Sequence, residues 1–259
     1  MLSVRVSAPG SLMLLGEYAV LHQKPALVMA MDKRVSVTLT PRTDDRILIH
    51  SKELGFYETK LSAFTIEKPL QFSLAAIDAL RSELKTGFDL HIDSEIKSTM
   101  GLGSSAAVTV ATLAALYTAL QKSMVPATFI QLARQIILKV QGRGSGADAA
   151  ASFLGGIVHY QTEPFVAEKF ALTHPITTLY VGYKTPTPIA INAVSARFKE
   201  KQGLYEALIN AIGECAAAGV QALQRDDWAH LGKLMSTQQA VMGALGVSNA
   251  DLNALITEL

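Results

Sequence analysis

The stretch Met100-Gly101-Leu102-Gly103-Ser104-Ser105-Ala106-Ala107 decides the fold of this chain. Before it, residues 88–96 alternate apolar and polar side chains, which predicts a half-buried strand. After it, residues 106–120 consist largely of Ala, Val and Leu, which predicts a buried helix. The predicted order is therefore strand, glycine-rich turn and helix.

The glycine-rich turn has the features of an anion-binding site. Gly101 and Gly103 allow backbone angles closed to other residues and let a ligand approach the main chain. Ser104 and Ser105 follow at the first helical turn, where unpaired N–H groups and the helix dipole favour a phosphate. The alternative is a plain glycine turn with Ser104 as the helix N-cap. On the turn alone, the two interpretations stand about even.

Composition excludes several classes of partner. Charged residues make up 17% of the 259 residues, and the formal net charge is +1 without a basic block, so neither nucleic acid nor an anionic membrane is expected to bind. The single cysteine, Cys215, has apolar neighbours and is predicted to be buried. The first residues alternate like a strand and lack the apolar core of a signal peptide. The longest apolar run, 106–120, is shorter than the roughly 20 residues of a membrane span. We therefore expect a cytoplasmic protein.

Residues 101–106 resemble the second motif of the GHMP kinases, the small-molecule kinase family that includes galactokinase, homoserine kinase and mevalonate kinase. That motif reads Pro-x-x-x-Gly-Leu-Gly-Ser-Ser-Ala, and Gly101–Ala106 match it without a gap. The stretch Ala8-Pro9-Gly10-Ser11, followed by Gly16-Glu17-Tyr18, is similar to the family's first motif. Ser11 stands where the family has a lysine near the accepting hydroxyl, and Tyr18 where mevalonate kinases often have a histidine. Candidates to replace the lysine's charge are Lys24, Lys33 and Arg34.

A third block, Gln141-Gly142-Arg143-Gly144-Ser145-Gly146-Ala147-Asp148, places glycines and an aspartate between two predicted helices. Taken alone, Asp148 is more often a helix cap than a base, by about two to one. Mevalonate and phosphomevalonate kinases have a similar block in which the aspartate is taken as the catalytic base, so the resemblance assigns that role to Asp148. Mevalonate kinases also keep a magnesium-binding glutamate eleven residues earlier, where this chain has Ile137.

The resemblance implies an α+β, two-layer GHMP-kinase fold. Its N-terminal ATP-binding domain would span residues 1–165, and its C-terminal α+β domain residues 166–259. The implied activity is an ATP-dependent kinase that phosphorylates the C5 hydroxyl of mevalonate, in isoprenoid precursor synthesis. The resemblance also allows a homodimer.

The resemblance also assigns residues to ligands. The ATP-binding residues would be Gly101, Leu102, Gly103, Ser104, Ser105 and Ala106. The residues that contact mevalonate would be Ser11, Glu17, Tyr18 and Thr185. Mg²⁺ would be held by Ser105 and Glu17.

Two alternatives remain open. Phosphomevalonate kinase is favoured by Gln141-Gly142 and by the missing glutamate, yet a second phosphate on the acceptor needs added cationic groups, and the first motif has lost one. A non-catalytic ATP-binding protein of the family is favoured by Ser11, by Ile137 and by the absence of the family's third glycine-rich motif. That motif would follow Leu259, so the resemblance predicts an incomplete C-terminal part.

The remaining segments predict the other elements. Residues 28–40 and 46–50 predict two paired strands, residues 69–84 an amphipathic helix, and residues 126–140 a helix that begins at Pro126. Residues 155–160 and 178–183 predict strands, with an extended connector at 184–188. Helices are predicted from Gly203 and from Asp226-Asp227. Ser248 and Asp251 have the spacing of a capping box before a last helix, whose apolar face comprises Leu252, Leu255, Ile256 and Leu259.

Overall fold

The chain forms two compact units in the computed structural model, which describes residues 2–97, 99–183, 185 and 187–258. The first unit comprises Met1–Leu12 and Ala30–Gly155, and the second Met13–Met29 and Gly156–Leu259. Two long strands, β1 (Val4–Leu15) and β2 (Ala26–Pro41), contribute residues to both units. The predicted α+β class is confirmed. The domain boundary after residue 165 stays a prediction, because compact units need not coincide with family domains.

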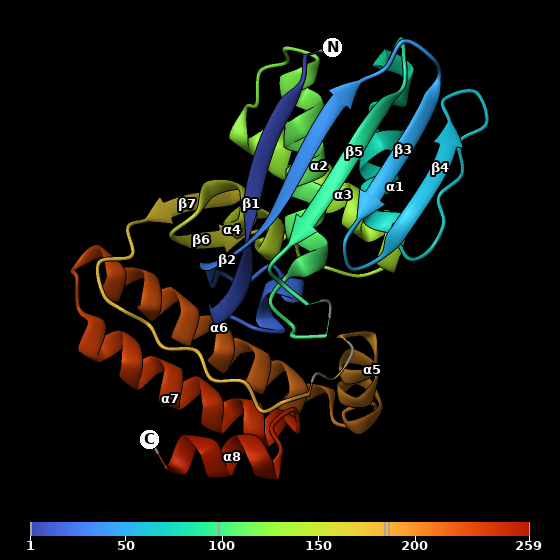
Figure 1. Cartoon of the computed structure of the whole chain (residues 1–259). Helices are drawn as coiled ribbons and strands as arrows, with labels where there is room; N and C mark the ends of the chain where they lie inside the picture. The colour runs from blue at the N-terminus through green and yellow to red at the C-terminus, as the bar shows by residue number, and fades with distance from the viewer. Residues whose placement is uncertain (1, 98, 184, 186, 259) are drawn as a thin grey trace. The chain divides into compact units, whose positions relative to one another are not determined.

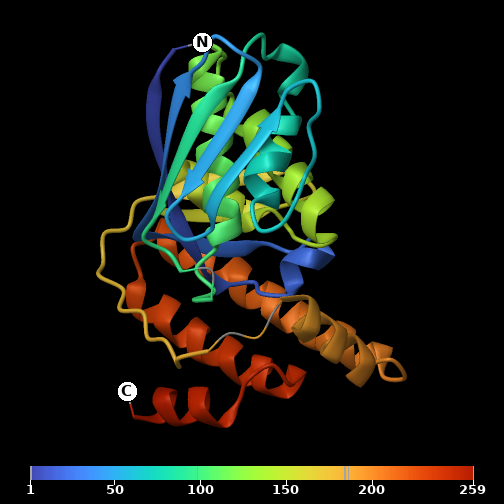
Figure 2. The same cartoon turned by 45° about the vertical axis from the view of Figure 1, so that its right-hand side comes forward.

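The first unit contains a twisted sheet with its helices packed on one face (Figures 1 and 2). Here β3 (Arg46–Ser51), β4 (Gly55–Lys60) and β5 (Phe88–Ser94) join β2 in the order β4-β3-β5-β2, and β1 also pairs with β2. β3 and β5 run parallel, whereas β3 and β4 run antiparallel. The predicted pairing of residues 28–40 with 46–50 is wrong, because β4 and β5 take the two edges of β3 and leave none for β2.

The helices of this unit bury one face of that sheet. They are α1 (Gln71–Asp78), the short η2 (Arg81–Glu83), α2 (Ser104–Ala119), α3 (Pro126–Gln141) and α4 (Ala147–Leu154). Alternate residues of β5, namely Phe88, Leu90 and Ile92, enter the core. α2 is buried on nearly all sides, which explains its almost uninterrupted apolar sequence. Within the described part of the chain, no helix has both the length and the apolar character needed to span a membrane.

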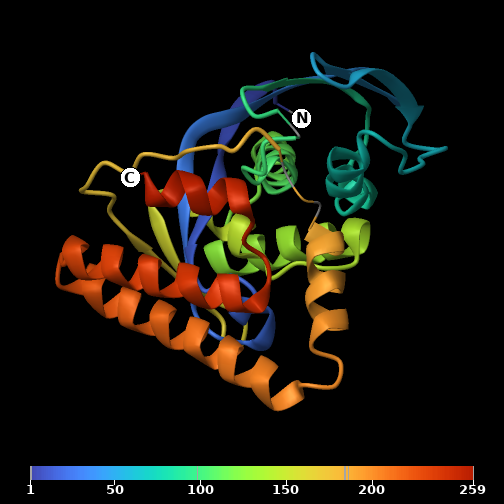
Figure 3. The same cartoon turned by 90° about the horizontal axis from the view of Figure 1, so that it is seen from below.

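The second unit combines a small antiparallel sheet with a layer of helices. β6 (Ile157–Gln161) pairs with the beginning of β2 on one side and with β7 (Val166–Phe170) on the other. The helices are η1 (Ala19–His22), α5 (Thr187–Arg197), α6 (Gln202–Gln224), α7 (Trp228–Leu245) and α8 (Ala250–Thr257). α6 and α7 are the long ones and lie side by side (Figures 1 and 3). A core formed by Tyr18, Val194, Phe198, Ile212 and Met242 joins η1, α5, α6 and α7.

Several predictions for this unit need correction. Residues 171–183 are all described and contain no strand, so the strand predicted at 178–183 is wrong. An alternating sequence forms a strand only where a neighbouring strand takes its backbone hydrogen bonds. The connector predicted at 184–188 partly lies outside the described residues, and α5 already begins at Thr187.

Four local predictions for the second unit can be compared with the structure: two helix starts, the burial of Cys215 and the apolar face of the last helix. α7 begins where a helix start was predicted, and Asp227 caps it, since its carboxylate accepts the His230 N–H. The last helix is capped by Asn249 and not by Ser248, whose hydroxyl donates instead to Asn253. Cys215 is buried as predicted, and its burial raises the pKa of the thiol. No residue of α8 is fully buried, so its predicted apolar face stays partly open to solvent.

Candidate functional site

The glycine-rich turn presents the unpaired beginning of a helix. Gly101 and Gly103 have φ values of 77° and 64°, in the left-handed region that favours glycine. Gly103 is the N-cap of α2, and no side chain caps this end. The interpretation of Ser104 as the N-cap is therefore wrong, since Ser104 is already the first helical residue. The first N–H groups of α2, which no described side chain caps, and the half-buried Ser104 and Ser105 hydroxyls form a cradle suited to phosphate.

The first motif packs directly against this turn. The Ser11 N–H donates to the Leu102 carbonyl over 3.1 Å, although the two residues are far apart in sequence. A Cβ atom on Gly103 would overlap the Ser11 hydroxyl oxygen, so this contact requires glycine at position 103. Ser11 itself is 1% exposed. Two of the three sequence blocks therefore meet in the first unit.

The third block joins them through a hydrogen bond. The Ser11 hydroxyl donates to Oδ1 of Asp148 over 2.8 Å. Asp148 lies in the first turn of α4, behind the N-cap Gly146, and is exposed to solvent. Its interpretation as a helix cap is therefore wrong, although a carboxylate in a first turn is also favoured by the helix dipole. An exposed carboxylate fixed by Ser11 beside the phosphate cradle is well placed to accept a proton from a bound hydroxyl group.

Arg34, one of the candidates to replace the charge of the family's lysine, is hydrogen-bonded to Ser7 and Glu95. Its Nε donates to the Ser7 hydroxyl over 2.9 Å and its Nη2 to the Ser7 carbonyl over 3.0 Å. Its backbone N–H donates to Glu95. The Arg34 guanidinium therefore bonds to Ser7, whereas the group that bonds to Asp148 is the neutral Ser11 hydroxyl.

The donor groups of the site suit a magnesium ion that arrives with a nucleotide. Ile137, at the position of the family's glutamate, is 6% exposed and faces the loop at Gly144. Among the described residues, no group of three or more His, Cys, Asp or Glu could hold a metal. Mg²⁺ bound to a nucleotide needs only one or two carboxylates besides phosphate oxygens and water. The Asp148 carboxylate and the Ser104 and Ser105 hydroxyls fit that smaller requirement.

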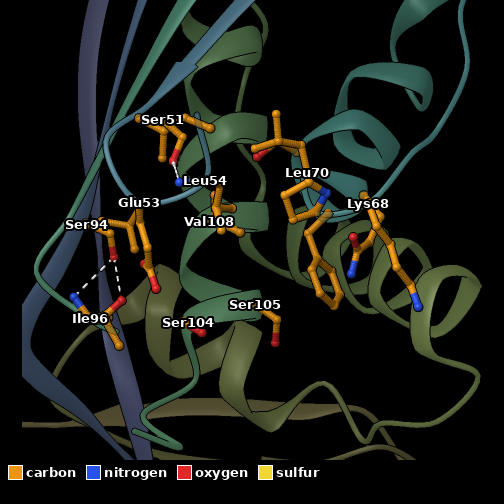
Figure 4. A pocket seen from close by; sticks show the side chains of 16 residues that line it. Ser51, Glu53, Leu54, Lys68, Leu70, Ser94, Ile96, Ser104, Ser105 and Val108 are labelled. Atoms are coloured by element: carbon orange, nitrogen blue, oxygen red, sulfur yellow. Dashed lines mark hydrogen bonds between the residues drawn. The ribbon is translucent and has the colours of Figure 1, made fainter. Parts of the chain in front are cut away.

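A cavity of about 400 Å³ opens beside the beginning of α2. Its walls are mostly apolar and include Val35, Leu54, Leu70, Phe72, Ile92 and Val108. Ser104 and Ser105 lie at one end, between Glu53 and Ser94 on one side and Lys68 on the other (Figure 4). The cavity therefore extends the phosphate cradle with an apolar compartment of a size typical for small-molecule sites. None of its wall residues outside the glycine-rich turn was expected from the sequence.

The predicted residues Glu17, Tyr18 and Thr185 belong to the second unit. Glu17 and Thr185 are exposed. Tyr18 is buried and has a φ of 63°, which is strained for a non-glycine residue. Burial raises the pKa of Tyr18 to about 12, and the charges of Glu17 and Tyr205 act in the same direction.

A buried glutamine, which the sequence did not single out, holds the turn before Tyr18. The Gly16 N–H donates to Oε1 of Gln238 over 2.7 Å, and Gln238 is 7% exposed. On α7, Gln238 shares a stripe with the buried Leu231, Met242 and Leu245. A polar residue at helical spacing on an apolar stripe is the signal that could have identified it.

The comparisons with known proteins agree with this arrangement. The family description "GHMP kinases N terminal domain" matches residues 71–156, a segment that holds the glycine-rich turn and Asp148. Mevalonate kinase from Pyrococcus abyssi is 29% identical over 271 residues, which cover 98% of this chain and 81% of that protein. Mevalonate kinase from Archaeoglobus fulgidus is 30% identical over 258 residues, which cover 98% and 84%.

A solved structure shows the same fold. The crystal structure of Methanococcus jannaschii mevalonate kinase superposes with a TM-score of 0.79 and 22% identity, over 99% of this chain and 83% of that one. Fold similarity and the identity to the Archaeoglobus protein extend over nearly the whole chain, well beyond the matched family segment. The chain therefore belongs to the GHMP kinase family.

Proposed function

We propose that this chain is an ATP-dependent mevalonate kinase, which transfers the γ-phosphoryl group of ATP to the C5 hydroxyl of mevalonate. The observation that carries the proposal is the hydrogen bond between Ser11 and Asp148 beside Gly103. It joins three sequence blocks around one carboxylate and one phosphate cradle. The names of the archaeal relatives supply the acceptor.

The nucleotide would span the glycine-rich turn and the cavity next to it. Residues Gly101–Ala106 would bind the phosphates through backbone N–H groups and the two serine hydroxyls. The base would enter the apolar cavity, where water is excluded from its flat faces. In this assignment the phosphates lie at the beginning of α2, and the ring of the base lies against the apolar walls of the cavity.

Asp148 would act as the general base. Its carboxylate takes the proton of the C5 hydroxyl while the hydroxyl oxygen attacks the γ-phosphorus, and ADP leaves. The Ser11 hydroxyl holds the carboxylate in position for this transfer. Mg²⁺, when bound, would neutralise charge on the phosphates, held by the Ser105 hydroxyl and by Asp148 or Glu17. Acceptor contacts from Ser11, Glu17, Tyr18 and Thr185 remain part of the proposal, as do a homodimer and a cytoplasmic location.

Phosphomevalonate kinase is the second candidate, favoured by Ile137 in place of a magnesium-binding glutamate. A phosphorylated acceptor adds negative charge, and a site for it needs fixed cations. The Ser11 hydroxyl that bonds Asp148 is neutral, and the Arg34 guanidinium donates its hydrogen bonds to Ser7. The neutral Ser11 beside Asp148 therefore favours the first candidate.

An acceptor panel tests the proposal. The purified chain is incubated with Mg-ATP and mevalonate, phosphomevalonate, galactose or homoserine, and ADP release is followed while phosphorus-31 NMR identifies the product. We expect the highest kcat/KM with mevalonate and a product phosphorylated at C5. A higher kcat/KM with phosphomevalonate would establish the second candidate. ATP binding without ADP release above the acceptor-free blank would show a non-catalytic protein.

A further inference from the structure

The cavity beside α2 contains a polar atom that its own walls leave unsatisfied. Gln71, the first residue of α1, lines the cavity, and its Oε1 is buried without a hydrogen-bond partner among the described residues. A buried acceptor without a donor is unfavourable. A ligand that brings a donor to this atom therefore gains affinity.

Three serine hydroxyls that line the cavity already make hydrogen bonds within the protein. The Ser94 hydroxyl donates to the Ile96 carbonyl and accepts the Ile96 N–H, and the Ser51 hydroxyl accepts the Leu54 N–H (Figure 4). The Ser73 hydroxyl accepts a hydrogen bond from Thr112. The Ser94 hydroxyl is thus used both as donor and as acceptor within the protein. Among the described residues that line the cavity, Oε1 of Gln71 is the buried side-chain acceptor without a hydrogen-bond partner.

The chemistry of an amide selects among nucleotide bases. A glutamine side chain offers one acceptor and two donors at its end, whichever way the amide is turned. The N6 and N7 edge of adenine offers a donor next to an acceptor, and a glutamine pairs with both at once. Guanine and hypoxanthine present two acceptors, O6 and N7, on the same edge. Either of them would leave Oε1 of Gln71 without a donor.

We propose that Gln71 determines the base specificity of the nucleotide site by pairing its amide with the 6-amino group and N7 of adenine. The proposal rests on the proposed function, because that function places ATP at the glycine-rich turn. Ser104 and Ser105 fix where the phosphates lie, and the cavity that they border contains Gln71. The base of the same nucleotide then lies within the cavity whose acceptor is unsatisfied.

The test compares ATP with inosine triphosphate, which carries a carbonyl in place of the 6-amino group. Steady-state kcat/KM and calorimetric affinity are measured for both nucleotides with the wild type, Gln71→Leu and Gln135→Leu. Gln135 is an exposed residue of α3 and controls for the change of glutamine to leucine. We expect the wild type to prefer ATP by about tenfold or more. Gln71→Leu should lose most of this preference by using ATP less well, and Gln135→Leu should keep it.

An unchanged ratio of ATP to inosine triphosphate in a folded Gln71→Leu variant would overturn the proposal, as would a wild type without preference. Should Gln71→Leu fail to fold, Gln71→Glu answers the same question. It keeps an acceptor for the 6-amino group but has no donor for N7. It should reject inosine triphosphate yet bind 7-deaza-ATP as tightly as ATP. The calorimetric ratio of the affinities for ATP and inosine triphosphate tests the role of Gln71 even if no acceptor is phosphorylated. Failure of the proposed function is therefore recognised separately.

Discussion

At the residue scale, the site depends on a neutral serine that orients a carboxylate. The Ser11 hydroxyl fills the space that a side chain at Gly103 would need and donates to Asp148. Residues 11, 103 and 148 are therefore mutually constrained, and a change at one alters the surroundings of the other two. A substitution at one of these residues reports on catalysis without affecting stability only if the new side chain has the same shape but different acid–base chemistry.

Replacing Asp148 by asparagine tests the catalytic role of Asp148 separately from its role in stability. Asparagine keeps the size of the side chain and can still accept the Ser11 hydroxyl, but it cannot take a proton from the acceptor. We expect Asp148→Asn to bind metal-free ATP normally and to lose about 10²–10⁴-fold in kcat. The measurement is steady-state turnover alongside calorimetric ATP affinity, with Asp93→Asn on the exposed face of β5 as control. Near-normal turnover in Asp148→Asn would place the base elsewhere.

Tyr18 predicts how stability depends on alkaline pH. The pKa of Tyr18 is about 12 in the folded chain, against about 10 in an unfolded chain. Because the folded pKa is raised, the stabilisation is complete below about pH 10 and is lost as the pH rises toward 12. The free energy of unfolding should fall more steeply over this interval in the wild type than in Tyr18→Phe. Urea unfolding at several pH values measures it, and equal slopes would contradict the assignment.

At the element scale, the sequence predicted elements with strong local signals and missed those defined by distant partners. α2 and α3 were located to within two residues, because their apolar runs and Pro126 act locally. The position of β5 between β2 and β3 depends on pairing across long separations, which alternation alone cannot specify. The strands β4 and β7 and the helix α5 lacked a clear periodic pattern and were not predicted.

The same limit applies to the candidate site. The glycine-rich turn and Asp148 were found because their blocks are contiguous in sequence. The bond between Ser11 and Asp148 joins residues 137 positions apart, and the unsatisfied Gln71 amide becomes apparent only once the cavity walls are assembled. Sequence alone proposed the residue types, and the packing of β1 against the turn brought them together.

The end of α3 allows a test of the missing glutamate. Ile137 is buried, so Ile137→Glu places a carboxylate where no partner awaits it. We expect a loss of stability on the order of 3–5 kcal/mol at pH 8. The loss should be smaller at pH 5, because a buried carboxyl group is then more readily neutral. Saturating Mg-ATP should recover part of it if the metal comes within reach of the new carboxylate.

Thermal unfolding with and without Mg-ATP measures the effect. Ile137→Val serves as the control, with an expected loss of about 0.5–1.5 kcal/mol that does not depend on pH or Mg²⁺. An Ile137→Glu variant as stable as the wild type at pH 8 would mean that the side chain reaches solvent or a cation.

At the scale of the whole molecule, a hydrogen bond joins two segments of the second unit that are far apart in the sequence. Gln238 and Gly16 are 222 positions apart and meet inside the second unit. This bond fixes the turn that precedes Glu17 and the strained Tyr18. Two of the four residues proposed to contact the acceptor, Glu17 and Tyr18, therefore follow a turn that is held by a helix near the other end of the sequence.

Removing that bond should affect the acceptor side selectively. Gln238→Leu leaves the Gly16 N–H buried without a partner, at a cost of about 1–3 kcal/mol. We expect a lower melting temperature and a higher KM for mevalonate, with ATP affinity unchanged. Gln221→Leu, on the exposed face of α6, should change none of these quantities. A parallel rise in the KM for ATP would show that the turn also serves the nucleotide.

The discontinuous make-up of the two compact units has a consequence for biosynthesis. Residues 13–29 emerge from the ribosome early, but the strand that pairs with Ala26–Met29 is β6, which is synthesised only after the whole first unit. A nascent chain that has reached Gly155 can therefore close its first unit while the beginning of β2 still lacks β6 on one of its edges. Such an unpaired strand edge promotes association between chains. Translation speed between residues 155 and 161, and chaperones that shield the exposed edge, should influence how much of the protein reaches its folded state.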